Sequence, residues 1–315
     1  MRIGWVGFHQ EGIAALNALM ADGAVVGVIT LVPELAAQRS AVGDYRGLCA
    51  GYGVPLHEVA HINDERSLEL MRAWDADVIF VIGWSQILSE EALAVARVGT
   101  VGAHASLLPD NRGSAPVNWA ILNGEQETGN SLMWLASDVD GGDLIDQMTF
   151  PITPYDTCAS LYEKVAETNK RMILRAVARF RSGVFPRRPQ GKSAQPLLRR
   201  RRPEDGRMDW NGDATALYRF VRALTRPYPG ALAYHQGRCW YVWQAVLVEL
   251  SAPPDVLPGT VVGALRSPEP RACGILVACG HGVLGILEMS DEHVKVLAGP
   301  ALCDAFSKGV RFQNE

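Results

Sequence analysis

Residues 1–31, MRIGWVGFHQEGIAALNALMADGAVVGVITL, contain the pattern that decides the fold. Residues 2–8 form an apolar run, residues 11–22 carry apolar side chains at helical spacing, and residues 24–31 are rich in Val and Ile. These periodicities predict a strand, a helix and a second strand. A strand, a crossover helix and a parallel strand make up the repeating unit of parallel α/β sheets.

A second unit of the same kind follows along the chain. Residues 66–74 have the pattern of an amphipathic helix, and residues 76–82 (ADVIFVI) are almost continuously apolar, as in strands buried on both faces of a parallel sheet. We therefore predict a Rossmann-like α/β domain with a parallel sheet, whose ligands bind beyond the carboxyl ends of the strands. Gly4, Gly7 and Gly12 lack the spacing of a dinucleotide-binding fingerprint, which argues against an NAD site.

The chain is predicted to form two domains. A long amphipathic helix is expected from residue 156 to about residue 181, and the Arg-, Pro- and Gly-rich segment after it has no apolar periodicity. We assign residues 1–185 to the first domain, residues 186–204 to a solvated linker and residues 205–315 to the second domain. The second domain contains six short Val-, Trp- and Tyr-rich segments separated by turns, which predict a smaller OB-like β-barrel.

Composition narrows the functional classes. Of the 315 residues, 48% are hydrophobic and 20% are charged, which is typical of a globular protein with a buried core. The formal net charge of −4 argues against broad nucleic-acid binding, which relies on Lys and Arg neutralising phosphates. No apolar stretch approaches the roughly 18 residues of a membrane span, and the N-terminus turns polar after Phe8, too early for a signal-peptide core. We expect a cytoplasmic protein that binds no membrane.

The sequence indicates no metal site. Its six cysteines are scattered without a Cys-x-x-Cys pair, so neither structural zinc nor a disulfide framework is expected. Buried reduced thiols are the simpler interpretation, because free cysteines are commonly buried. The seven histidines form no group with the spacing of metal ligands.

Residues suited to catalysis gather in two stretches. Residues 102–119 read GAHASLLPDNRGSAPVNW and place His104 at the end of a strand, and residues 137–143 read SDVDGGD and contain Asp140. A carboxylate that accepts a hydrogen bond from one imidazole nitrogen fixes the tautomer of the ring and supports general-base action. His104 and Asp140 are therefore a candidate acid–base pair. Spacing alone does not show that they meet, and a structural histidine is the alternative.

At these stretches the sequence resembles the 10-formyltetrahydrofolate-dependent formyltransferase family. The resemblance is carried, in the family's order and spacing, by His104-Ala-Ser-Leu-Leu-Pro109, Arg112-Gly113, Ala115-Pro116, Asn118-Trp119, Glu127-Thr-Gly129 and Asp140-x-Gly142. In overall layout the chain is most similar to the sugar-nucleotide N-formyltransferases that act on UDP-4-amino-4-deoxy-arabinose. The resemblance extends from residue 1 to about residue 240 and, more weakly, over the C-terminal domain.

The resemblance implies both a donor and a mechanism. 10-Formyltetrahydrofolate would supply the formyl group, and the loop of residues 82–88 would receive its pterin, largely through backbone groups. His104 would take a proton from the attacking amine, and Asp140 would orient the imidazole. The residues implied in folate binding are Ile82, Gly83, Trp84, Ile87, Leu88 and Asp138.

Acceptor binding is expected beside the same residues. Arg112 lies in a turn near His104, where a guanidinium would clamp a pyrophosphate, and stabilisation of the turn is the alternative, slightly less favoured. His9 follows the first strand and would line the acceptor pocket or remain a solvated loop residue. The candidate substrate-binding residues are Ser106, Leu107, Leu108, Arg112 and His9.

Gly102 departs from the family pattern. The family's transferases carry an Asn two residues before the catalytic His, and its amide is thought to hold the formyl oxygen as that oxygen becomes negative. Removing one such donor typically costs about 10²–10³ in rate. The alternatives are an altered formyltransferase, transfer of another group such as formimidoyl, a formyltetrahydrofolate hydrolase, or a folate-binding protein without turnover.

The charge of the second domain points to a small acceptor. Residues 203–315 contain ten Lys or Arg and twelve Asp or Glu, whereas a domain that holds tRNA should be basic. A small amine remains, and the resemblance favours an amino sugar, a 4-amino-4-deoxy sugar linked to a nucleotide. A homodimer is left open, because some sugar formyltransferases dimerise.

Overall fold

The computed structural model describes residues 1–293 and 295–314. The chain divides into two compact units, each built from segments that are separated in the sequence. The first unit comprises Met1–Pro116, Gln126–Ile152 and Ser160–Arg200, and the second comprises Val117–Glu125, Thr153–Ala159 and Arg201–Glu315.

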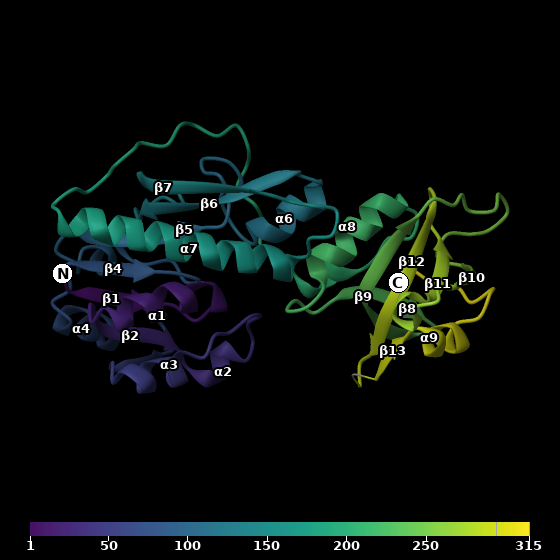
Figure 1. The fold of residues 1–315 in the computed structure, drawn as a ribbon, viewed down its shortest axis with the longest axis horizontal. Helices are drawn as coiled ribbons and strands as arrows, with labels where there is room; N and C mark the ends of the chain where they lie inside the picture. The colour runs from purple at the N-terminus through teal and green to yellow at the C-terminus, as the bar shows by residue number, and fades with distance from the viewer. Residues whose placement is uncertain (294, 315) are drawn as a thin grey trace. The chain divides into compact units, whose positions relative to one another are not determined.

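A seven-stranded sheet forms the centre of the first unit (Figure 1). Its strands are β1 (Ile3–Val6), β2 (Val25–Leu31), β3 (Leu56–Val59), β4 (Val78–Val81), β5 (Gly99–His104), β6 (Glu127–Trp134) and β7 (Leu144–Pro151). They lie in the order β3-β2-β1-β4-β5-β6-β7, and the pairs from β3 to β5 are parallel. β6 and β7 run antiparallel to their neighbours.

The last two strands correct the prediction of a parallel sheet. Residues 135–143 alone join β6 to β7, whereas two adjacent parallel strands need a crossover of about a dozen or more residues. The short connection therefore produces an antiparallel hairpin. It also brings the predicted acidic loop to the β5 side of the sheet, because β6 pairs directly with β5, with His104 opposite Ser131.

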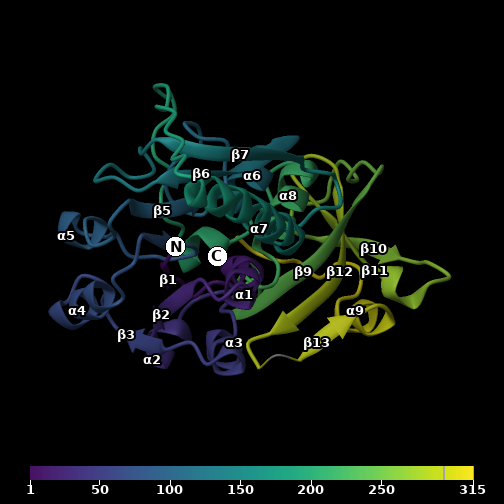
Figure 2. The same ribbon diagram turned by 60° about the vertical axis from the view of Figure 1, so that its left-hand side comes forward.

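Helices cover both faces of this sheet (Figure 2). They are η1 (Gln10–Gly12), α1 (Ile13–Ala21), α2 (Pro33–Ala36), α3 (Tyr45–Tyr52), α4 (Glu65–Ala73), α5 (Glu90–Leu93) and α7 (Cys158–Arg181). Successive residues of a strand point to opposite faces, so Trp5 packs with residues of α1 and α7, whereas Val6 packs with residues of α4. The helices predicted near residues 11–22, 66–74 and 156–181 are confirmed as α1, α4 and α7.

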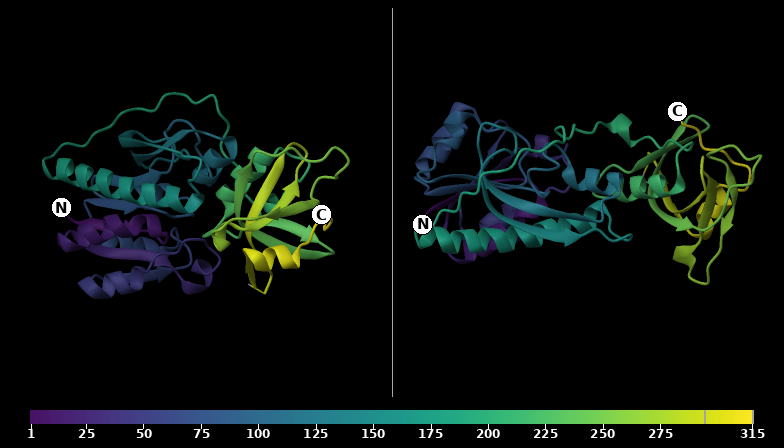
Figure 3. Two further views of the ribbon diagram at one scale, coloured as in Figure 1. Left: turned by 45° about the vertical axis from the view of Figure 1, so that its right-hand side comes forward. Right: turned by 90° about the horizontal axis from the view of Figure 1, so that it is seen from above.

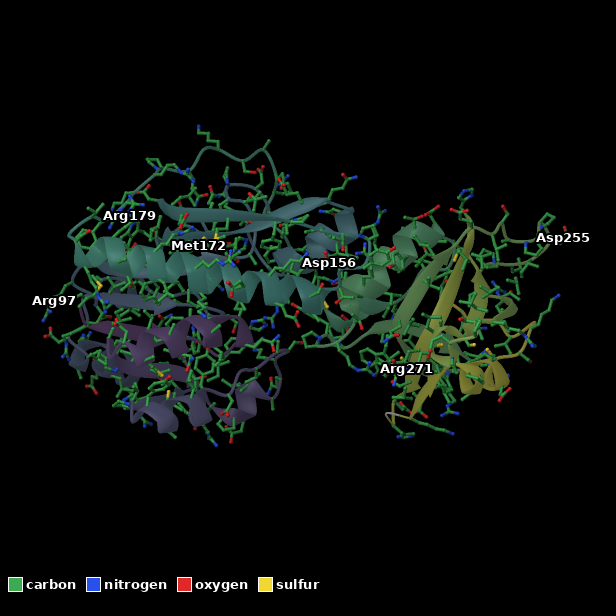
Figure 4. The ribbon with its side chains drawn as sticks, in the orientation of Figure 1. Arg97, Asp156, Met172, Arg179, Asp255 and Arg271 are labelled. Carbon is green, nitrogen blue, oxygen red and sulfur yellow. The ribbon has the colours of Figure 1, made fainter. Side chains whose placement is uncertain are left out.

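Helix α7 runs along the sheet (Figure 3). The helix is amphipathic because its buried residues are regularly spaced. Its buried residues recur three or four positions apart, as they must to share one helical face, and include Met172, Ala176, Val177 and Phe180. Arg179 lies on the exposed side of the same helix (Figure 4).

Gly27 marks a position where the packing of β2 against Trp74 leaves no room for a side chain. A Cβ there would stand 2.6 and 2.7 Å from Cε2 and Cδ1 of the indole, and Trp74 is buried. Gly27→Ala is therefore expected to destabilise the protein by about 1–3 kcal/mol, the usual cost of overpacking. Unfolding midpoints in urea and on heating test this.

Gly51→Ala is the matched control for that substitution. Gly51 lies in α3, where an added Cβ meets nothing within 4 Å. Alanine in a helix is better than glycine by about 0.5–1 kcal/mol, so this variant should unfold at or slightly above the wild-type midpoint. Equal shifts in the two variants would contradict the packing argument.

The second unit is built around an antiparallel sheet of six strands. They are β8 (Ala231–His235), β9 (Arg238–Val248), β10 (Val261–Leu265), β11 (Gly274–Ala278), β12 (Val283–Asp291) and β13 (Val296–Ala298). The order is β10-β11-β12-β9-β8, with β13 paired to β12. The helices of this unit are α6 (Pro116–Asn123), α8 (Ala214–Leu224) and α9 (Pro300–Ala305), and its short 3-10 turns are η2 (Pro203–Gly206) and η3 (Pro270–Ala272).

The six predicted strand segments of this unit are confirmed, apart from residue 294, which lies outside the described residues. A closed barrel is not confirmed, because within the described ranges no strand ladder joins β8 to β10. Instead, two isolated bridges from the C-terminal segment reach both edges of the sheet, Tyr234 with Gln313 and Thr260 with Arg311.

The cysteines are all free, as expected. Burial raises the pKa of the Cys158 thiol to about 12 and that of the Cys49 and Cys279 thiols to about 11. These three thiols therefore stay protonated near neutral pH, and a protonated thiol is neither a nucleophile nor a metal ligand. Residues 1–293 and 295–314 hold no group of three or more His, Cys, Asp or Glu side chains arranged to bind a metal ion. Over the same ranges, none of the helices has the length and apolar character needed to cross a bilayer.

Candidate active site

The candidate site lies at the carboxyl end of β5. His104 is the last residue of this strand, and its neighbour strands are the parallel β4 and the antiparallel β6. The imidazole is almost completely buried. Parallel α/β sheets bind their ligands at this edge, so the strand order itself puts His104 where chemistry is expected.

Both nitrogens of the His104 ring face acceptor atoms. Nε2 lies 2.8 Å from the carbonyl oxygen of Asn111, and Nδ1 lies 3.5 Å from Oδ2 of Asp140. A carbonyl oxygen only accepts, so Nε2 carries a proton in this arrangement. For Nε2 to act as a base, its contact with the Asn111 carbonyl must be replaced by the incoming amine, with Nδ1–H donating to Asp140.

Asp140 is held in place by the turn that follows β5. Its Oδ2 accepts a hydrogen bond of 2.9 Å from the backbone N–H of Gly113. Its own backbone has a φ of 51°, in the left-handed region that non-glycine residues rarely adopt. Gly142 is required nearby, because a Cβ there would overlap the carbonyl oxygen of Trp134. The Asp-x-Gly spacing thus follows from the close passage of this loop over the end of β6.

Ser106, Leu107 and Leu108 shape the turn after β5. Ser106 is buried and its hydroxyl donates to the carbonyl of Asp110. Leu108 is buried against β6 and β7, and Leu107 packs over Gly129. The side chains of Ser106 and Leu108 are therefore occupied within the protein, whereas Leu107 is half-buried.

Arg112 projects from the tip of the same turn. Its Nη1 stands 3.7 Å from the position that a Cβ on Gly141 would take, so the guanidinium lies beside the acidic loop. Arg112 is half-buried, whereas Asp138 in that loop is exposed. The structure therefore brings Arg112, Asp138 and the pair His104–Asp140 to one place.

The loop after β4 lies on the other side of the site and divides into buried and exposed parts. Ile82 and Leu88 are buried, and Trp84 packs on Phe8 with ring centroids 6.0 Å apart. Ile87 has 71% of its surface exposed, unusual for a large apolar residue, and is available to a flat apolar ligand.

Gly83 ties this loop to the end of β1. Its φ is 62°, and a Cβ there would stand 2.5 Å from Cβ of His9, so only glycine fits. The carbonyl of Gly83 accepts a hydrogen bond from the N–H of His9 at 3.3 Å. His9 is therefore placed against the predicted folate loop.

His9 is buried rather than solvated, and it belongs to a polar cluster that sequence reasoning missed. Its Nδ1 lies 3.3 Å from Oε2 of Glu11, and its ring packs on Tyr162 with centroids 4.8 Å apart. The Tyr45 hydroxyl donates to the His9 carbonyl at 3.0 Å, and burial raises the pKa of Tyr45 well above its usual range, which keeps it a donor. The sequence signal for this cluster was Glu11, an acidic residue two positions after His9 at the end of a strand.

Gly102 is covered by Leu135. The two residues lie near each other because β5 and β6 pair and the N–H of Leu135 donates to the carbonyl of Thr100. A Cβ on Gly102 would stand 2.5 Å from Cδ2 and 3.0 Å from Cγ of Leu135. The volume that an Asn side chain would need at position 102 is therefore occupied by an apolar side chain.

Residues predicted as a linker also reach the site. The segment that follows α7, residues 186–200, which we call the strap, passes back over the first unit (Figure 1). Its Gln190 hydrogen bonds to the Asp140 loop, and its Gln195 and Leu198 hydrogen bond to the turn of residues 110–114. The sequence of the strap has no periodicity that would have signalled these contacts.

With this geometry in place, comparison with known proteins defines the class. Residues 8–177 match the formyl transferase family, and residues 200–307 match the C-terminal domain of formyl transferases. Together these matches cover most of the chain, which belongs to the formyl transferase family. The recognition of a formyltransferase from the sequence motifs is confirmed.

Several solved structures share the fold. HypX from Aquifex aeolicus, in complex with tetrahydrofolic acid, matches with a TM-score of 0.69 and 21% identity over 98% of this chain. The chain spans about half the length of HypX, 48% of that chain. An N-formyltransferase from Helicobacter canadensis, in complex with folinic acid and dTDP-3-aminofucose, matches with a TM-score of 0.65 and 15% identity over 91% of this chain and 99% of its own. WlaRD, a sugar 3N-formyl transferase, matches with a TM-score of 0.64 and 14% identity over 91% of this chain and 97% of its own.

Proposed function

We propose that this protein transfers a formyl group from 10-formyltetrahydrofolate to the amine of a nucleotide-linked amino sugar. The observation that carries the proposal is the pair formed by the buried His104 at the carboxyl end of β5 and the half-buried Asp140, in a chain that belongs to the formyl transferase family. An amine attacks carbon only when neutral, and the tetrahedral intermediate must lose a proton from nitrogen. A histidine oriented by a carboxylate is suited to accept that proton.

The reaction balances with His104 as the proton carrier. The amine nitrogen bonds to the formyl carbon, His104 Nε2 accepts a proton from that nitrogen, and the bond between the formyl carbon and N10 of the folate breaks. N10 receives a proton as it leaves, so the products are a formamide and tetrahydrofolate. In the structure the carbonyl oxygen of Asn111 lies 2.8 Å from Nε2 of His104. The entering amine takes the place of this carbonyl.

The donor is proposed to bind along the loop after β4. The HypX structure contains tetrahydrofolic acid, and the two sugar formyltransferase structures contain folinic acid or 5-N-formyl-THF. In this chain the exposed Ile87 offers an apolar surface, while Gly83 keeps the loop close to β1. We assign Ile82, Trp84, Leu88 and Asp138 to the same donor site.

The acceptor is proposed to be a sugar nucleotide with a free amine. Residues 203–315 are formally acidic, which disfavours tRNA, and the Helicobacter canadensis enzyme was solved with dTDP-3-aminofucose. Arg112 is placed beside the catalytic loop, where a guanidinium can bind a pyrophosphate through paired hydrogen bonds. We retain a 4-amino-4-deoxy sugar as the specific proposal.

Hydrolysis of 10-formyltetrahydrofolate is the second candidate. It is favoured by one observation, the apolar Leu135 in the volume that an Asn at position 102 would occupy. Without an amide for the formyl oxygen, the tetrahedral intermediate loses stabilisation whether an amine or water attacks the formyl carbon. A reaction mixture without an acceptor therefore decides between transfer and hydrolysis.

One screen separates these functions. The purified protein is incubated with 10-formyltetrahydrofolate and a panel of UDP- and dTDP-linked 3-amino and 4-amino sugars, and each mixture is examined by mass spectrometry beside a mixture without acceptor. Transfer is expected to add the mass of one CO to a single acceptor. Formate release without acceptor would identify the hydrolase, and no change in donor or acceptors would contradict both proposals.

A further inference from the structure

Gln190 connects the strap to the loop that carries Asp140. Its Nε2 donates to the carbonyl oxygen of Asp140 at 2.9 Å and to that of Gly142 at 2.7 Å. Both acceptors are backbone carbonyls, so the amide must present its nitrogen to them. One side chain therefore bridges the loop on both sides of Gly141.

This bridge acts where the backbone needs support. Asp140 has a φ of 51°, a conformation that a non-glycine residue keeps only when its surroundings impose it. Gln190 also leaves its Oε1 buried without a hydrogen-bond partner among the described residues. A buried polar atom without a partner costs stability, and such exceptions in folded proteins call for an explanation. Here the explanation is the pair of bonds that the Nε2 side makes.

The strap holds the facing turn as well. Gln195 accepts from the N–H of Asn111 at 3.1 Å, and Leu198 exchanges backbone hydrogen bonds with Arg112 and Ser114 at 2.7 and 3.0 Å. That turn supplies the Gly113 N–H that binds the Asp140 carboxylate. The carboxylate is thus fixed from the turn, and its backbone is fixed by Gln190.

We propose that Gln190 is a positioning residue that keeps the Asp140 carboxylate against His104 during catalysis. The expected effect on kcat rests on the proposed formyl transfer. The expected effect on the position of the Asp140 carboxylate does not. Both hydrogen bonds that Gln190 donates end on backbone carbonyls, so Gln190 acts on the carboxylate through the loop. The strap, which belongs to the first unit, is therefore part of the catalytic apparatus.

The test replaces Gln190 with methionine, which keeps the length of the side chain and removes the donor. kcat for formyl transfer is expected to fall by about 10–100-fold, the size of effect known for hydrogen bonds that orient metal-binding side chains, with KM for the folate donor nearly unchanged. Lys192→Met is the matched control, because Lys192 lies on the same strap and is exposed. It should behave as wild type.

A double variant distinguishes positioning from general weakening of the fold. If Gln190 acts through Asp140, Gln190→Met combined with Asp140→Asn should lose no more activity than Asp140→Asn alone. Additive losses, or a loss confined to KM and thermal stability, would overturn the proposal. Unchanged kcat in Gln190→Met would do the same.

A spectroscopic measurement keeps this test independent of the proposed function. The imidazole ¹H–¹⁵N signals of His104, assigned by their loss in His104→Ala, are recorded in wild type, Gln190→Met, Asp140→Asn and Lys192→Met. Gln190→Met should shift them in the direction of Asp140→Asn, and Lys192→Met should leave them unchanged. If wild type forms no formylated acceptor, the proposed function fails while these spectra still decide the role of Gln190.

Discussion

His104→Ala is expected to lower kcat for formyl transfer by about 10²–10⁴-fold, the contribution of a well-placed general base. The imidazole is buried at the end of β5, and its Nδ1 faces the Asp140 carboxylate. The proposed mechanism assigns the proton transfer to this ring. The donor loop lies after β4, and its Gly83 contacts His9. Folate affinity should therefore change little.

The measurement pairs single-turnover rates with folate binding by fluorescence or calorimetry. His57→Ala is the matched control, because His57 lies in the edge strand β3, which three strands separate from β5, and should keep both activity and binding. Retained kcat in His104→Ala would remove the acid–base pair from the mechanism. Loss of folate binding together with kcat would instead make His104 a structural residue.

The pattern of apolar residues was sufficient to predict the elements that carry the site. β1, α1 and β2 follow from the periodicity of residues 1–31, because a helix or strand that is buried on one face or on both has apolar residues at regular spacing. His104 was found from the strand that it ends, and Asp140 from an acidic glycine-rich loop. Their 3.5 Å approach was not predictable, since it depends on the antiparallel pairing of β6 with β5.

Contacts between segments without periodicity could not be predicted. Gln190 lies 50 positions from Asp140 and bonds to a backbone carbonyl, which any residue type provides. The strap therefore had the composition of a linker while making specific hydrogen bonds. Glu11 differs from Gln190, because its position two residues after His9 is visible in the sequence, although the contact between the two side chains depends on a tight turn after β1.

The role of Gly102 is the clearest case in which structure changes the expectation. If Gly102 is the only defect, the sequence alone predicts that Gly102→Asn raises the rate of formyl transfer by about one to three orders of magnitude, since it restores the missing oxyanion donor. Gly102 and His104 lie two positions apart on β5 and so face the same side of the sheet. An Asn at this position would therefore aim at the reacting group, but its Cβ would stand 2.5 Å from Leu135.

We therefore expect Gly102→Asn alone to gain little and to unfold more easily, because it overpacks a site that is already filled. Gly102→Asn combined with Leu135→Ala is expected to raise kcat by about 10²–10³-fold over wild type, the worth of one oxyanion donor. Leu135→Ala alone is the control for loosening of the loop and should not raise kcat. The four proteins are compared with one acceptor and with the same folate donor.

The outcomes separate an impaired site from one rebuilt around an apolar residue. A full gain in the single variant would show that Leu135 yields readily and that Gly102 is the sole departure from the family. No gain in the folded double variant would mean that another group holds the formyl oxygen, so an added amide is redundant. Formate release that falls as transfer rises in the double variant would show that Leu135 favours water over the amine, because the same carbonyl partitions between the two acceptors.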